Sequence, residues 1–486
     1  MSEPRPVAVI VLAAGEGTRM KSQVPKVLHT LCGRSMLGHA LAAARELQPQ
    51  RLVVVAGHGR EQVTAEVARV APAATVVVQE RLGGTGHAVR MVTEALGTLH
   101  GIVVVTYGDM PLLRAETLAA LVAEHAVQGN AVTVLTARVA NPFGYGRILR
   151  DDQGALTGIV EEADATPRQR AIPEINSGCY AFDGALLGDA IKRVATGNAQ
   201  GQEYLTDVVD ILRTDGYPVG AVIAADAGEI QGVNDRVQLA HVRRALNDRL
   251  LDGWMRSGVT IVDPAATWVD ADVTIGQDAE IRPGSHLQGS TSIGARARVG
   301  PDCTLTDTEV GDDASVSYAV TRSARIGDGA SVGPFAYLRP GAAIGAGAHI
   351  GTYVELKNST VGEGSKVPHL SYVGDADIGR EVNIGAGTIF ANYDGAAKHH
   401  STVGDGVFVG SDSVLIAPVT IGDGAYTAAG SAISEDVPPG ALGVARGRQH
   451  NSAGWTEKRR PGTKSAAAAA RARQRASENT GDGETL

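Results

Sequence analysis

A glycine-containing loop follows the first apolar run of the chain, and its residues are of types that can bind ligands or take part in catalysis. It reads Leu-Ala-Ala-Gly-Glu-Gly-Thr-Arg-Met over residues 12–20. Glycines let backbone N–H groups approach a phosphate closely, and Arg19 and Lys26 add two cations. A P-loop is excluded because Gly-Lys-Ser/Thr is absent, and a dinucleotide fingerprint because Met20 replaces the third glycine. The loop suits a triphosphate whose α-phosphorus is attacked; the alternative is a plain turn with exposed cations.

A carboxylate follows a second apolar run. Residues 102–106 lead into Tyr107-Gly108-Asp109, which places Asp109 at the carboxyl end of a predicted strand. Open α/β sheets bind ligands at that end, and a carboxylate oxygen there suits Mg²⁺. A turn-forming aspartate ahead of Pro111 is an equally common explanation, so this residue alone does not decide between the two.

The elements that must position these residues follow an α/β pattern. Short β-branched runs alternate with helical stretches, with strands predicted at 7–12, 52–56, 75–78 and 102–106 and a helix at 36–47. Because strands this apolar belong in a buried, mostly parallel sheet, we expect a Rossmann-like α/β domain over residues 1–234. Apolar residues at helical spacing then predict a linking helix over 235–258.

Beyond residue 259 the sequence has a period of six. Each unit offers one aliphatic side chain to an interior shared with its neighbours, and small residues allow the chain to turn at corners. The period predicts an all-β parallel β-helix over residues 259–446, with a glycine-rich β-sandwich as the weaker alternative. It also explains why aromatic residues are only 4% of the chain while glycines number 61. The longest unbroken run of in-phase aliphatic residues is Ile326, Val332, Leu338, Ile344, Ile350 and Leu356.

Function in a repetitive scaffold is expected where the repeat is broken. Arg339 stands where neighbouring units carry glycine, and the period is lost at 366–372 and again at 390–400. The first of these breaks contains His369. Histidine can serve as a general base because its unperturbed pKa lies near neutral pH. We therefore take His369 as a candidate base; the alternative is a corner histidine bonded to backbone.

Composition and charge exclude several classes of protein. The chain has 486 residues, with 44 Lys and Arg against 53 Asp and Glu, and its net charge of −9 argues against a nucleic-acid binder. Three separated cysteines without a CxxC pair argue against a disulfide framework or structural zinc and favour a reducing compartment. We find no leader pattern and no apolar run of membrane-spanning length, so we expect a cytoplasmic protein without a membrane partner. Residues 447–486 form a C-terminal tail, and the low-complexity part at 461–486 is expected to be mobile.

The motifs, taken together, resemble those of one bacterial family. The loop at 12–20 continues into Pro25-Lys26, and Tyr-Gly-Asp follows at 107–109. With the hexapeptide half, this order is similar to that of the bifunctional N-acetylglucosamine-1-phosphate uridylyltransferase / glucosamine-1-phosphate acetyltransferases over about residues 7–446. The further matching motifs are Gln79 with Gly-Thr-Gly-His-Ala at 84–88, Gly-Tyr-Gly-Arg-Ile at 144–148, Gly-Ile-Val-Glu at 158–161, Glu-Ile-Asn-Ser-Gly at 174–178 and Gly-Val-Asn at 232–234.

The resemblance implies a two-step synthesis of UDP-N-acetylglucosamine, a precursor for peptidoglycan and lipopolysaccharide. Glucosamine 1-phosphate would first accept the acetyl group of acetyl-CoA. The resulting N-acetylglucosamine 1-phosphate would then accept the uridylyl group of UTP in the presence of Mg²⁺, with release of pyrophosphate. The resemblance also implies a left-handed β-helix and a homotrimer with acetyl-transfer sites between subunits.

In the N-terminal domain the resemblance assigns residues to three tasks. Arg19 and Lys26 would stabilise charge on the transferring phosphate, and Asp109 and Asn234 would hold Mg²⁺. This division fits an in-line attack, which depends on positioning and electrostatics more than on a covalent nucleophile. The residues implied to bind the nucleotide and sugar are Leu12, Ala13, Ala14, Gly15, Lys26, Gln79, Gly84, Thr85, Tyr107, Gly108, Asp109, Gly146, Glu161, Asn176 and Asn234.

In the repeat domain the resemblance is carried by Gly-Pro-Phe-Ala at 333–336, Leu-Arg-Pro-Gly at 338–341, Val-Glu-Leu-Lys at 354–357, Asn-Ile-Gly-Ala-Gly at 383–387 and Asn-Tyr-Asp-Gly at 392–395. It implies that His369 is the general base and that Glu355 orients it. The residues implied to bind glucosamine phosphate are Arg339, Lys357, Tyr372, Asn383 and Lys398, where cations would meet phosphate. Those implied to bind acetyl-CoA are Ala386, Asn392, Tyr393, Ser411, Ala429 and Arg446.

Some positions depart from the family pattern, and other readings remain. Gly83 stands where a larger apolar residue is expected, Tyr337 where a basic residue is common, and His399-His400 replace an aromatic/basic pair. A zinc site built from histidines is one rival reading. The others are a single-activity nucleotide-sugar pyrophosphorylase with a structural β-helix and a non-catalytic relative that binds partners. The histidines proposed as zinc ligands would be His349, His369, His399 and His400.

Overall fold

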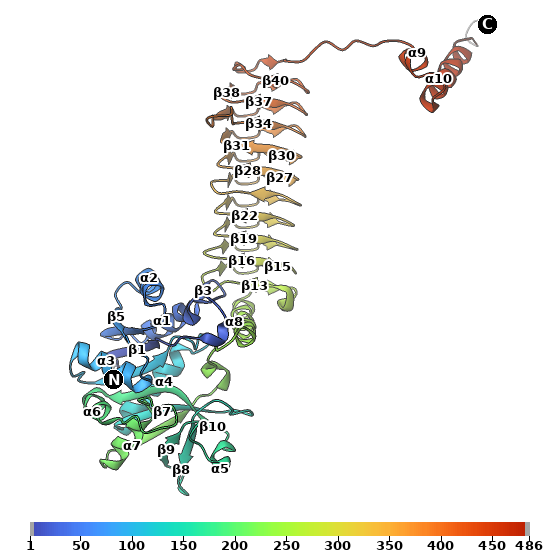
Figure 1. The fold of residues 1–486 in the computed structure, drawn as a ribbon. Helices are drawn as coiled ribbons and strands as arrows, with labels where there is room; N and C mark the ends of the chain where they lie inside the picture. Colours follow the sequence, from blue (N-terminus) through green and yellow to red (C-terminus); the bar gives the residue numbers. More distant parts are fainter. Residues whose placement is uncertain (1–3, 482–486) are drawn as a thin grey trace.

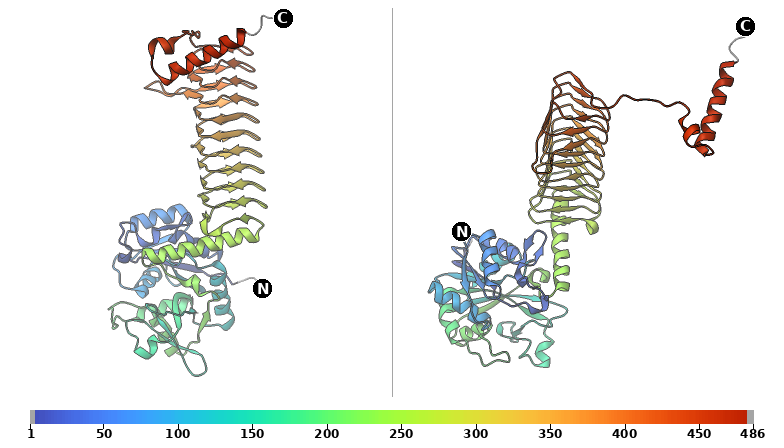
Figure 2. Two further views of the ribbon diagram at one scale, coloured as in Figure 1. Left: turned by 90° about the vertical axis from the view of Figure 1, so that its right-hand side faces the viewer. Right: turned by 45° about the horizontal axis from the view of Figure 1, so that its top comes forward.

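The computed structural model describes residues 4–481 and has two parts joined by one long helix (Figure 1). An α/β domain lies at the N-terminal end, and a column of stacked coils rises from it. Helix α8 (Arg236–Arg256) lies between the two parts (Figure 2). The expected fold class, a Rossmann-like α/β domain followed by a parallel β-helix of hexapeptide repeats, is confirmed.

The sheet of the N-terminal domain is mostly parallel, as its apolar strands predict. Its order is β11-β7-β10-β6-β1-β4-β5, with β10 antiparallel to β6 and β7, and the hairpin β8–β9 pairs with β10. Strand β1 is buried along its whole length because helices cover both faces of the sheet. The strands are β1 (Ala8–Ala13), β4 (Arg51–Ala56), β5 (Thr75–Val78), β6 (Ile102–Tyr107), β7 (Val132–Arg138), β8 (Arg147–Arg150), β9 (Leu156–Val160), β10 (Glu174–Asp183) and β11 (Val219–Ile223).

The helices of this domain pack on the two faces of the sheet and form a core on each. Helices α1, α2 and α4 contribute to one core, and α3, α6 and α7 to the other. The carboxyl ends of β1, β5 and β6 remain open between these layers, where α/β folds bind ligands. The bounds are α1 (Met36–Glu46), α2 (Arg60–Val70), α3 (Thr85–Leu96), α4 (Ala115–Gln128), α6 (Gly184–Ala190) and α7 (Asp207–Thr214).

Helix α8 takes part in the cores on both sides of it. Its first turns place Leu239, Val242 and Leu246 in a small core with the N-terminal domain. Its last turns place Leu251 in the core of the column, with Trp254 packed against it. The helix therefore closes the lower end of the column, which a solenoid needs because its terminal coil has no neighbour.

The column consists of three parallel sheets, named here the first, second and third sheet, which each coil visits in turn. Each inward-facing aliphatic residue stacks on its counterpart one coil below, as Ile326, Ile344 and Val361 do. Since each coil visits three sheets and turns one aliphatic residue inward on each of them, such residues recur every six positions along the chain. The first sheet runs from β12 (Thr260–Ile261) to β41 (Leu442–Gly443), the second from β13 (Trp268–Val269) to β40 (Ala432–Ile433), and the third from β14 (Thr274–Ile275) to β38 (Val419–Ile421).

The turn from the first to the second sheet forms a vertical edge that we name the site corner. In its lower part, bulky side chains adopt positive φ values that L-residues rarely take. The rings of Tyr318, Phe335 and Tyr353 stack there with centroids 5.4 Å apart, and the exposed Leu370 follows. Above Leu370 the corner carries small or polar residues. The corner residues in order are Tyr318, Phe335, Tyr353, Leu370, Gly387, Asp412 and Gly430.

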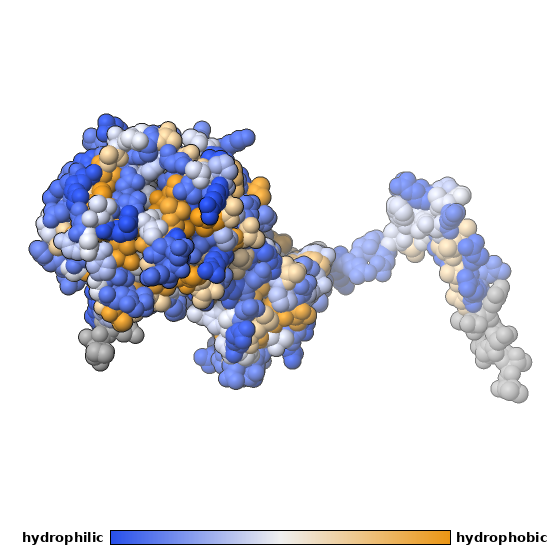
Figure 3. Space-filling view, turned by 90° about the horizontal axis from the view of Figure 1, so that it is seen from below, coloured by the Kyte–Doolittle hydropathy of each residue, from blue (hydrophilic) through white to orange (hydrophobic). Residues whose placement is uncertain are grey.

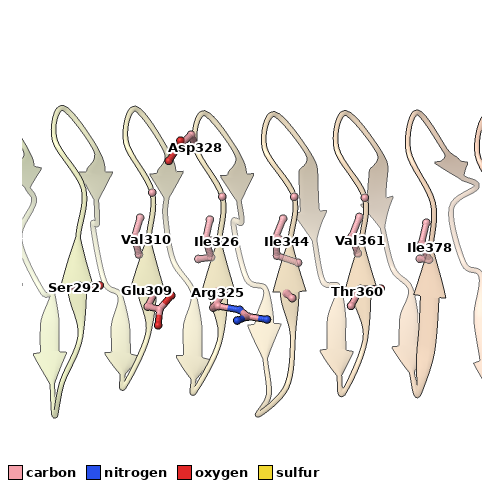
Figure 4. Close-up of a pocket in the computed structure, with 15 residues that line it drawn as sticks. Ser292, Glu309, Val310, Arg325, Ile326, Asp328, Ile344, Thr360, Val361 and Ile378 are labelled. Carbon is pink, nitrogen blue, oxygen red and sulfur yellow. The ribbon is translucent and has the colours of Figure 1, made fainter.

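A hollow of about 580 Å³ lies along the third sheet and is lined by stacked units of the repeat (Figure 4). Val310, Ile326, Ile344 and Val361 follow one another through it, with Arg325 at its margin. Since none of the predicted site residues lines this hollow, we interpret it as a consequence of the regular repeat.

The segment expected to be a mobile low-complexity tail, residues 461–486, contains a helix. Residues in this segment form α10 (Lys464–Gly481), which packs against α9 (Trp455–Arg459). Its run of alanines interspersed with arginines has a high helix propensity, and this outweighs the low complexity of the segment. The pair of helices extends away from the top of the column (Figure 1). Residues 482–486 lie outside the described part.

The lower face of the N-terminal domain presents apolar patches between polar residues (Figure 3). Such a mixture is ordinary for a protein surface, to which apolar atoms contribute substantially. Among residues 4–481, no helix has the combination of length and apolar character needed to cross a membrane.

Candidate functional site

A cavity of about 300 Å³ opens at the carboxyl ends of β1, β5 and β6. It brings together residues that are far apart in sequence, and most of the predicted nucleotide-binding set lines it. The predicted residues in its wall are Leu12, Ala13, Ala14, Gly15, Lys26, Gln79, Gly84, Thr85, Tyr107 and Asp109. Sequence reasoning missed Val27, Leu82, Ala88 and Gln202, which also line it.

Glycine is required where helix α3 begins, at the edge of this cavity. Gly84 has a φ of 103°, and a Cβ on it would lie 2.5 Å from the carbonyl oxygen of Glu203. The Gly86 N–H donates to that same carbonyl at 2.8 Å, and Thr85 Oγ1 accepts from the Leu205 N–H at 3.1 Å. The segment that follows Gln202 therefore closes against α3 and forms one wall of the cavity.

The unexpected Gly83 has a steric explanation. A Cβ there would lie 2.9 Å from the ring of His87, so a larger residue would displace that ring. The His87 ring in turn contacts the side chain of Gln79, with 2.8 Å between its Nδ1 and Gln79 Nε2. The adjacent Leu82 is 38% exposed and lines the cavity. Leu82 thus supplies the apolar surface that was expected from position 83.

The cationic and acidic candidates meet at the floor of the cavity. Lys26 pairs with Asp109, and its Nζ lies 3.4 Å from Asn234 Oδ1. A positive charge therefore already lies between two hard oxygen ligands, which fits the expected metal pair. Asp109 and Asn234 provide only two ligands, so a bound Mg²⁺ would complete its shell with phosphate oxygens and water.

The residues predicted to contact the N-acetyl sugar form a second group next to Tyr107. Asn176 donates its backbone N–H to the Gly146 carbonyl at 2.8 Å, and a Cβ on Gly146 would lie 3.4 Å from Glu161. Tyr107 is partly buried, and this burial, together with the charges of Glu161 and Asp109, raises its pKa. The ring of Tyr107 therefore lies near a carboxylate of each group, Glu161 among the predicted sugar contacts and Asp109 at the floor of the cavity. Gly178, with a φ of 83°, leaves room for that ring.

Two arginines of α8 brace the loop that carries Arg19 and Lys26. Arg236 donates to the Met20 carbonyl at 3.2 Å, and Arg243 donates to the Thr30 carbonyl at 2.8 Å. Both ends of the segment between those carbonyls are thereby fixed to the linking helix. Arg19 itself is exposed and does not line the cavity, whereas Lys26 points into it.

Asp207, near the residues predicted to contact the N-acetyl sugar, gives a testable pH dependence of folding stability. Burial, with Asp210 and Asp164 adding like charge, raises its pKa to about 6 from an ordinary 3.8. A raised carboxyl pKa means that the folded state binds the proton more tightly, so this group lowers stability above pH 6 and less so as the pH falls toward 4. We expect Asp207→Asn to raise the Tm at pH 8, with the difference shrinking as the pH falls through 6. Thermal unfolding at several pH values measures this.

The matched control for that experiment is Asp189→Asn, since the Asp189 side chain is 85% exposed. It should leave the Tm and its pH dependence unchanged. A lower Tm for Asp207→Asn at pH 8 would contradict the prediction.

His369 lies at the end of β30 (Lys366–His369), immediately before Leu370 of the site corner, and it is exposed. The predicted acetyl-CoA residues Ala386, Ser411 and Ala429 come just before the corner residues of the next three coils. Hydrogen bonds link this series, from the Gly387 N–H to the His369 carbonyl at 3.1 Å and onward up the corner. Coils are about 4.8 Å apart, so the series forms a line of small residues that rises from the candidate base.

The predicted phosphate-binding cations lie on the second sheet. Arg339 follows β25 (Tyr337–Leu338), Lys357 ends β28 (Glu355–Lys357), and Tyr372 begins β31 (Tyr372–Gly374). Lys398 comes from the loop above and lies beside Lys357, whose hydrogen bond and charge lower the pKa of Lys398. This pair of like charges suits an anion.

Within this single chain Glu355 has another partner than His369. It accepts a hydrogen bond from Arg339 at 2.9 Å, and no hydrogen bond to His369 occurs among the residues that the structure describes. The strand register explains this difference: Glu355 faces outward from the second sheet next to Arg339, whereas His369 ends a strand of the first sheet. Glu355 therefore contacts a cation within one chain, and its orienting role toward His369 stays a prediction.

The remaining predicted residues are divided between faces. Asn383 lies on β33 (Asn383–Ile384) of the first sheet and Arg446 follows β41 of that sheet, while Asn392 and Tyr393 follow β34 (Ile389–Ala391) of the second. Asn392 is buried and Tyr393 is exposed. The predicted set thus wraps around the site corner and is not gathered in one closed pocket of the chain.

Three of the four histidines proposed as zinc ligands have other partners. His399 pairs with Asp394 at 2.7 Å and His400 with Asp377 at 2.9 Å, which holds the loop of 390–400. His349 contacts Ser331 Oγ at 2.8 Å. Within residues 4–481, no cluster of three or more His, Cys, Asp or Glu side chains has an arrangement that could hold a metal ion.

Comparison with known proteins matches both halves of the chain. The family of MobA-like NTP transferase domains matches residues 9–171, and that of bacterial transferase hexapeptides (six repeats) matches 323–358 and 400–435. A protein of Thermobifida fusca named bifunctional protein GlmU is 62% identical over 99% of this chain and 100% of its own length. Proteins of the same name from Streptomyces avermitilis and Streptomyces griseus are 60% and 58% identical, over 96% and 100% of this chain and 98% and 100% of their own lengths.

Proposed function

The chain belongs to the family of bifunctional GlmU proteins, and from that premise we propose how its two domains divide the work. The β-helix acetylates glucosamine 1-phosphate with acetyl-CoA. The N-terminal domain then transfers the uridylyl group of UTP to N-acetylglucosamine 1-phosphate and releases pyrophosphate. The observation that carries the proposal is the presence of two separate groups of side chains. Lys26 pairs with Asp109 in one domain. In the other, the cation cluster of Arg339, Lys357 and Lys398 lies at the second sheet. His369 ends a strand of the first sheet beside the site corner. Because UTP and acetyl-CoA are cytoplasmic metabolites, we assign the protein to the cytoplasm.

In the uridylyl transfer, the phosphate oxygen of the sugar attacks the α-phosphorus of UTP, and the bond to pyrophosphate breaks. Asp109 and Asn234 would hold Mg²⁺, which would neutralise charge on the triphosphate. Lys26 would leave its pairing with Asp109 and bind the transferring phosphate, with Arg19 assisting from the loop. Glu161, Asn176 and the other residues of the sugar group would orient the acceptor so that attack is in line.

In the acetyl transfer, the amine of glucosamine 1-phosphate attacks the thioester carbonyl of acetyl-CoA. His369 would take the proton from the nitrogen as the carbon–nitrogen bond forms. The carbon–sulfur bond then breaks, and coenzyme A leaves as the thiol. Arg339, Lys357 and Lys398 would hold the sugar phosphate. The thioester arm would run along the small residues of the site corner.

Two assays on the full-length protein test this function. We expect thiol release from acetyl-CoA that depends on glucosamine 1-phosphate, and pyrophosphate release from UTP that depends on N-acetylglucosamine 1-phosphate and Mg²⁺. Pyrophosphate release without thiol release would favour a single-activity pyrophosphorylase with a structural β-helix. Neither activity in folded protein would favour a non-catalytic relative.

We also propose that the protein is a homotrimer with an acetyl-transfer site between neighbouring copies. Support comes from the division of the predicted residues between the first and second sheets and from the exposed aromatic ladder below Leu370. A second copy would cover that ladder and place its own first-sheet residues opposite the cations. Light scattering should give three times the chain mass of 50.1 kDa, and a monomer that retains full acetyl transfer would contradict the shared site.

A further inference from the structure

A buried carboxylate that the proposed reaction does not use lies beneath the cation cluster. Asp375 follows β31 at the corner between the second and third sheets, with a φ of 50°, and is 8% exposed. Both of its oxygens accept from Lys357 Nζ at 3.1 Å, while Asn358 Nδ2 and Asn392 Nδ2 donate at 2.8 and 2.5 Å. The Asp375 side chain therefore contacts both Lys357, which is predicted to bind the sugar phosphate, and Asn392, which is predicted to bind acetyl-CoA.

The surroundings keep this carboxylate charged. Burial alone would raise its pKa, but the hydrogen bonds from Asn358, Lys357 and Asn392 and the charge of Lys357 outweigh burial and lower it. A buried charge is tolerated when it is paired and fully hydrogen-bonded, and such an arrangement is rigid. Asp375 is thus a fixed anion in an otherwise cationic region.

The Asp375 carboxylate offsets the electrostatic repulsion between two neighbouring lysines. Lys357 and Lys398 lie side by side, and the pKa of Lys398 is lowered by this proximity. With no phosphate bound, Asp375 is the acidic partner that holds Lys357 against the repulsion. The residue before it, Gly374, adds to the arrangement, because a Cβ there would lie 2.4 Å from the Tyr372 hydroxyl and 2.7 Å from Asn392 Nδ2.

We propose that Asp375 is a positioning residue for acetyl transfer, which fixes Lys357 and Asn392 in one arrangement and so links the residues proposed to hold the sugar phosphate to those proposed to hold acetyl-CoA. The inference rests on the proposed acetyl transfer, in which those two residues contact the substrates. Asp375 itself would touch neither substrate, since its oxygens are occupied by the three donors.

The variants Asp375→Asn and Asp375→Ser test this role in the full-length protein. Both variants lose the charge-assisted hydrogen bond between Asp375 and Lys357. Because Lys357 is then no longer held in place, the KM for glucosamine 1-phosphate should rise roughly 10–100-fold. The KM for acetyl-CoA should rise as well because Asn392 loses its acceptor, while kcat changes less. Uridylyl transfer by the same molecules should be unchanged, and a kcat for acetyl transfer close to that of wild type shows that the β-helix is folded. Serine carries a hydroxyl, which can donate or accept, and no amide group, so agreement between the two variants excludes an artefact of the asparagine amide.

The matched control is Asp307→Asn. Asp307 occupies the same corner several coils below, with a φ of 48°, and accepts from the backbone and hydroxyl of Ser290. It has no contact with the cation cluster, so this variant should keep wild-type KM values.

A double-mutant cycle separates positioning from simple stabilisation. If Asp375 acts through Lys357, Asp375→Asn should have little further effect on the KM for glucosamine 1-phosphate in a Lys357→Gln background. Additive effects, or KM values for Asp375→Asn and Asp375→Ser that match Asp307→Asn, would overturn the inference. Absence of thiol release from wild type would instead overturn the proposed acetyl transfer, and the two failures are thus distinguished.

Discussion

Alanine in place of His369 should nearly abolish acetyl transfer. A positioned general base contributes about 10²–10⁴-fold to a rate, so thiol release that depends on glucosamine 1-phosphate should fall by that factor, mainly in kcat. The acceptor amine would then have to lose its proton to water. Uridylyl transfer should continue at the wild-type rate because His369 lies in the β-helix and Lys26 and Asp109 lie in the other domain.

His286→Ala provides the control for this variant. His286 also lies on the column, on β16 (His286–Gln288), well below the site corner residues that follow His369. Its replacement should leave both activities unchanged. Thiol release from His369→Ala at the wild-type rate would show that another group takes the proton.

Replacing Asp109 by alanine should abolish the other activity. The variant removes a ligand of the proposed Mg²⁺ and leaves Lys26 without its acidic partner. A bound metal ion contributes several kcal/mol to transition-state stabilisation, which corresponds to about 10³-fold in rate. Pyrophosphate release from UTP should fall by at least this much, and acetyl transfer should remain at the wild-type level.

Removal of the metal from wild type by a chelator should reproduce the loss, and the chelator should have no further effect on Asp109→Ala. The control is Asp151→Ala, because Asp151 is exposed and caps a turn through the N–H groups of Gln153 and Ala155. Metal-dependent uridylyl transfer by Asp109→Ala at the wild-type rate would reject Asp109 as a ligand.

Periodicity predicted the fold because each period reflects a repeated physical constraint. Strands such as β1 are apolar throughout since both faces are covered, and the period of six follows from one inward aliphatic residue per side of the coil. In the tail, the helix propensity of alanine and arginine explains α10, and the mobility predicted from low complexity stays a prediction.

Motif spacing marked candidates such as Lys26 and Asp109 near chain turns but did not indicate their partners. Lys26 and Asp109 are 83 residues apart, and only the folded sheet brings them together. Gln202 and Leu82 line the cavity without any motif to mark them. Glu355 pairs with Arg339 because the two lie on one face, which strand register decides and sequence order does not. No feature of the sequence distinguished Asp375 from other corner residues, because aspartate is common at positive φ in such corners.

Because helix α8 contributes to the cores of both domains, it limits where the chain could be cut to separate them. A cut before it would uncover the apolar surface that Val242 and Leu246 cover on the N-terminal domain, and a cut after it would leave the lowest coil without Leu251. Either fragment would expose apolar area that favours aggregation. A single cleavage therefore cannot yield two sound enzymes, and an independent version of each half would need its own copy of the helix.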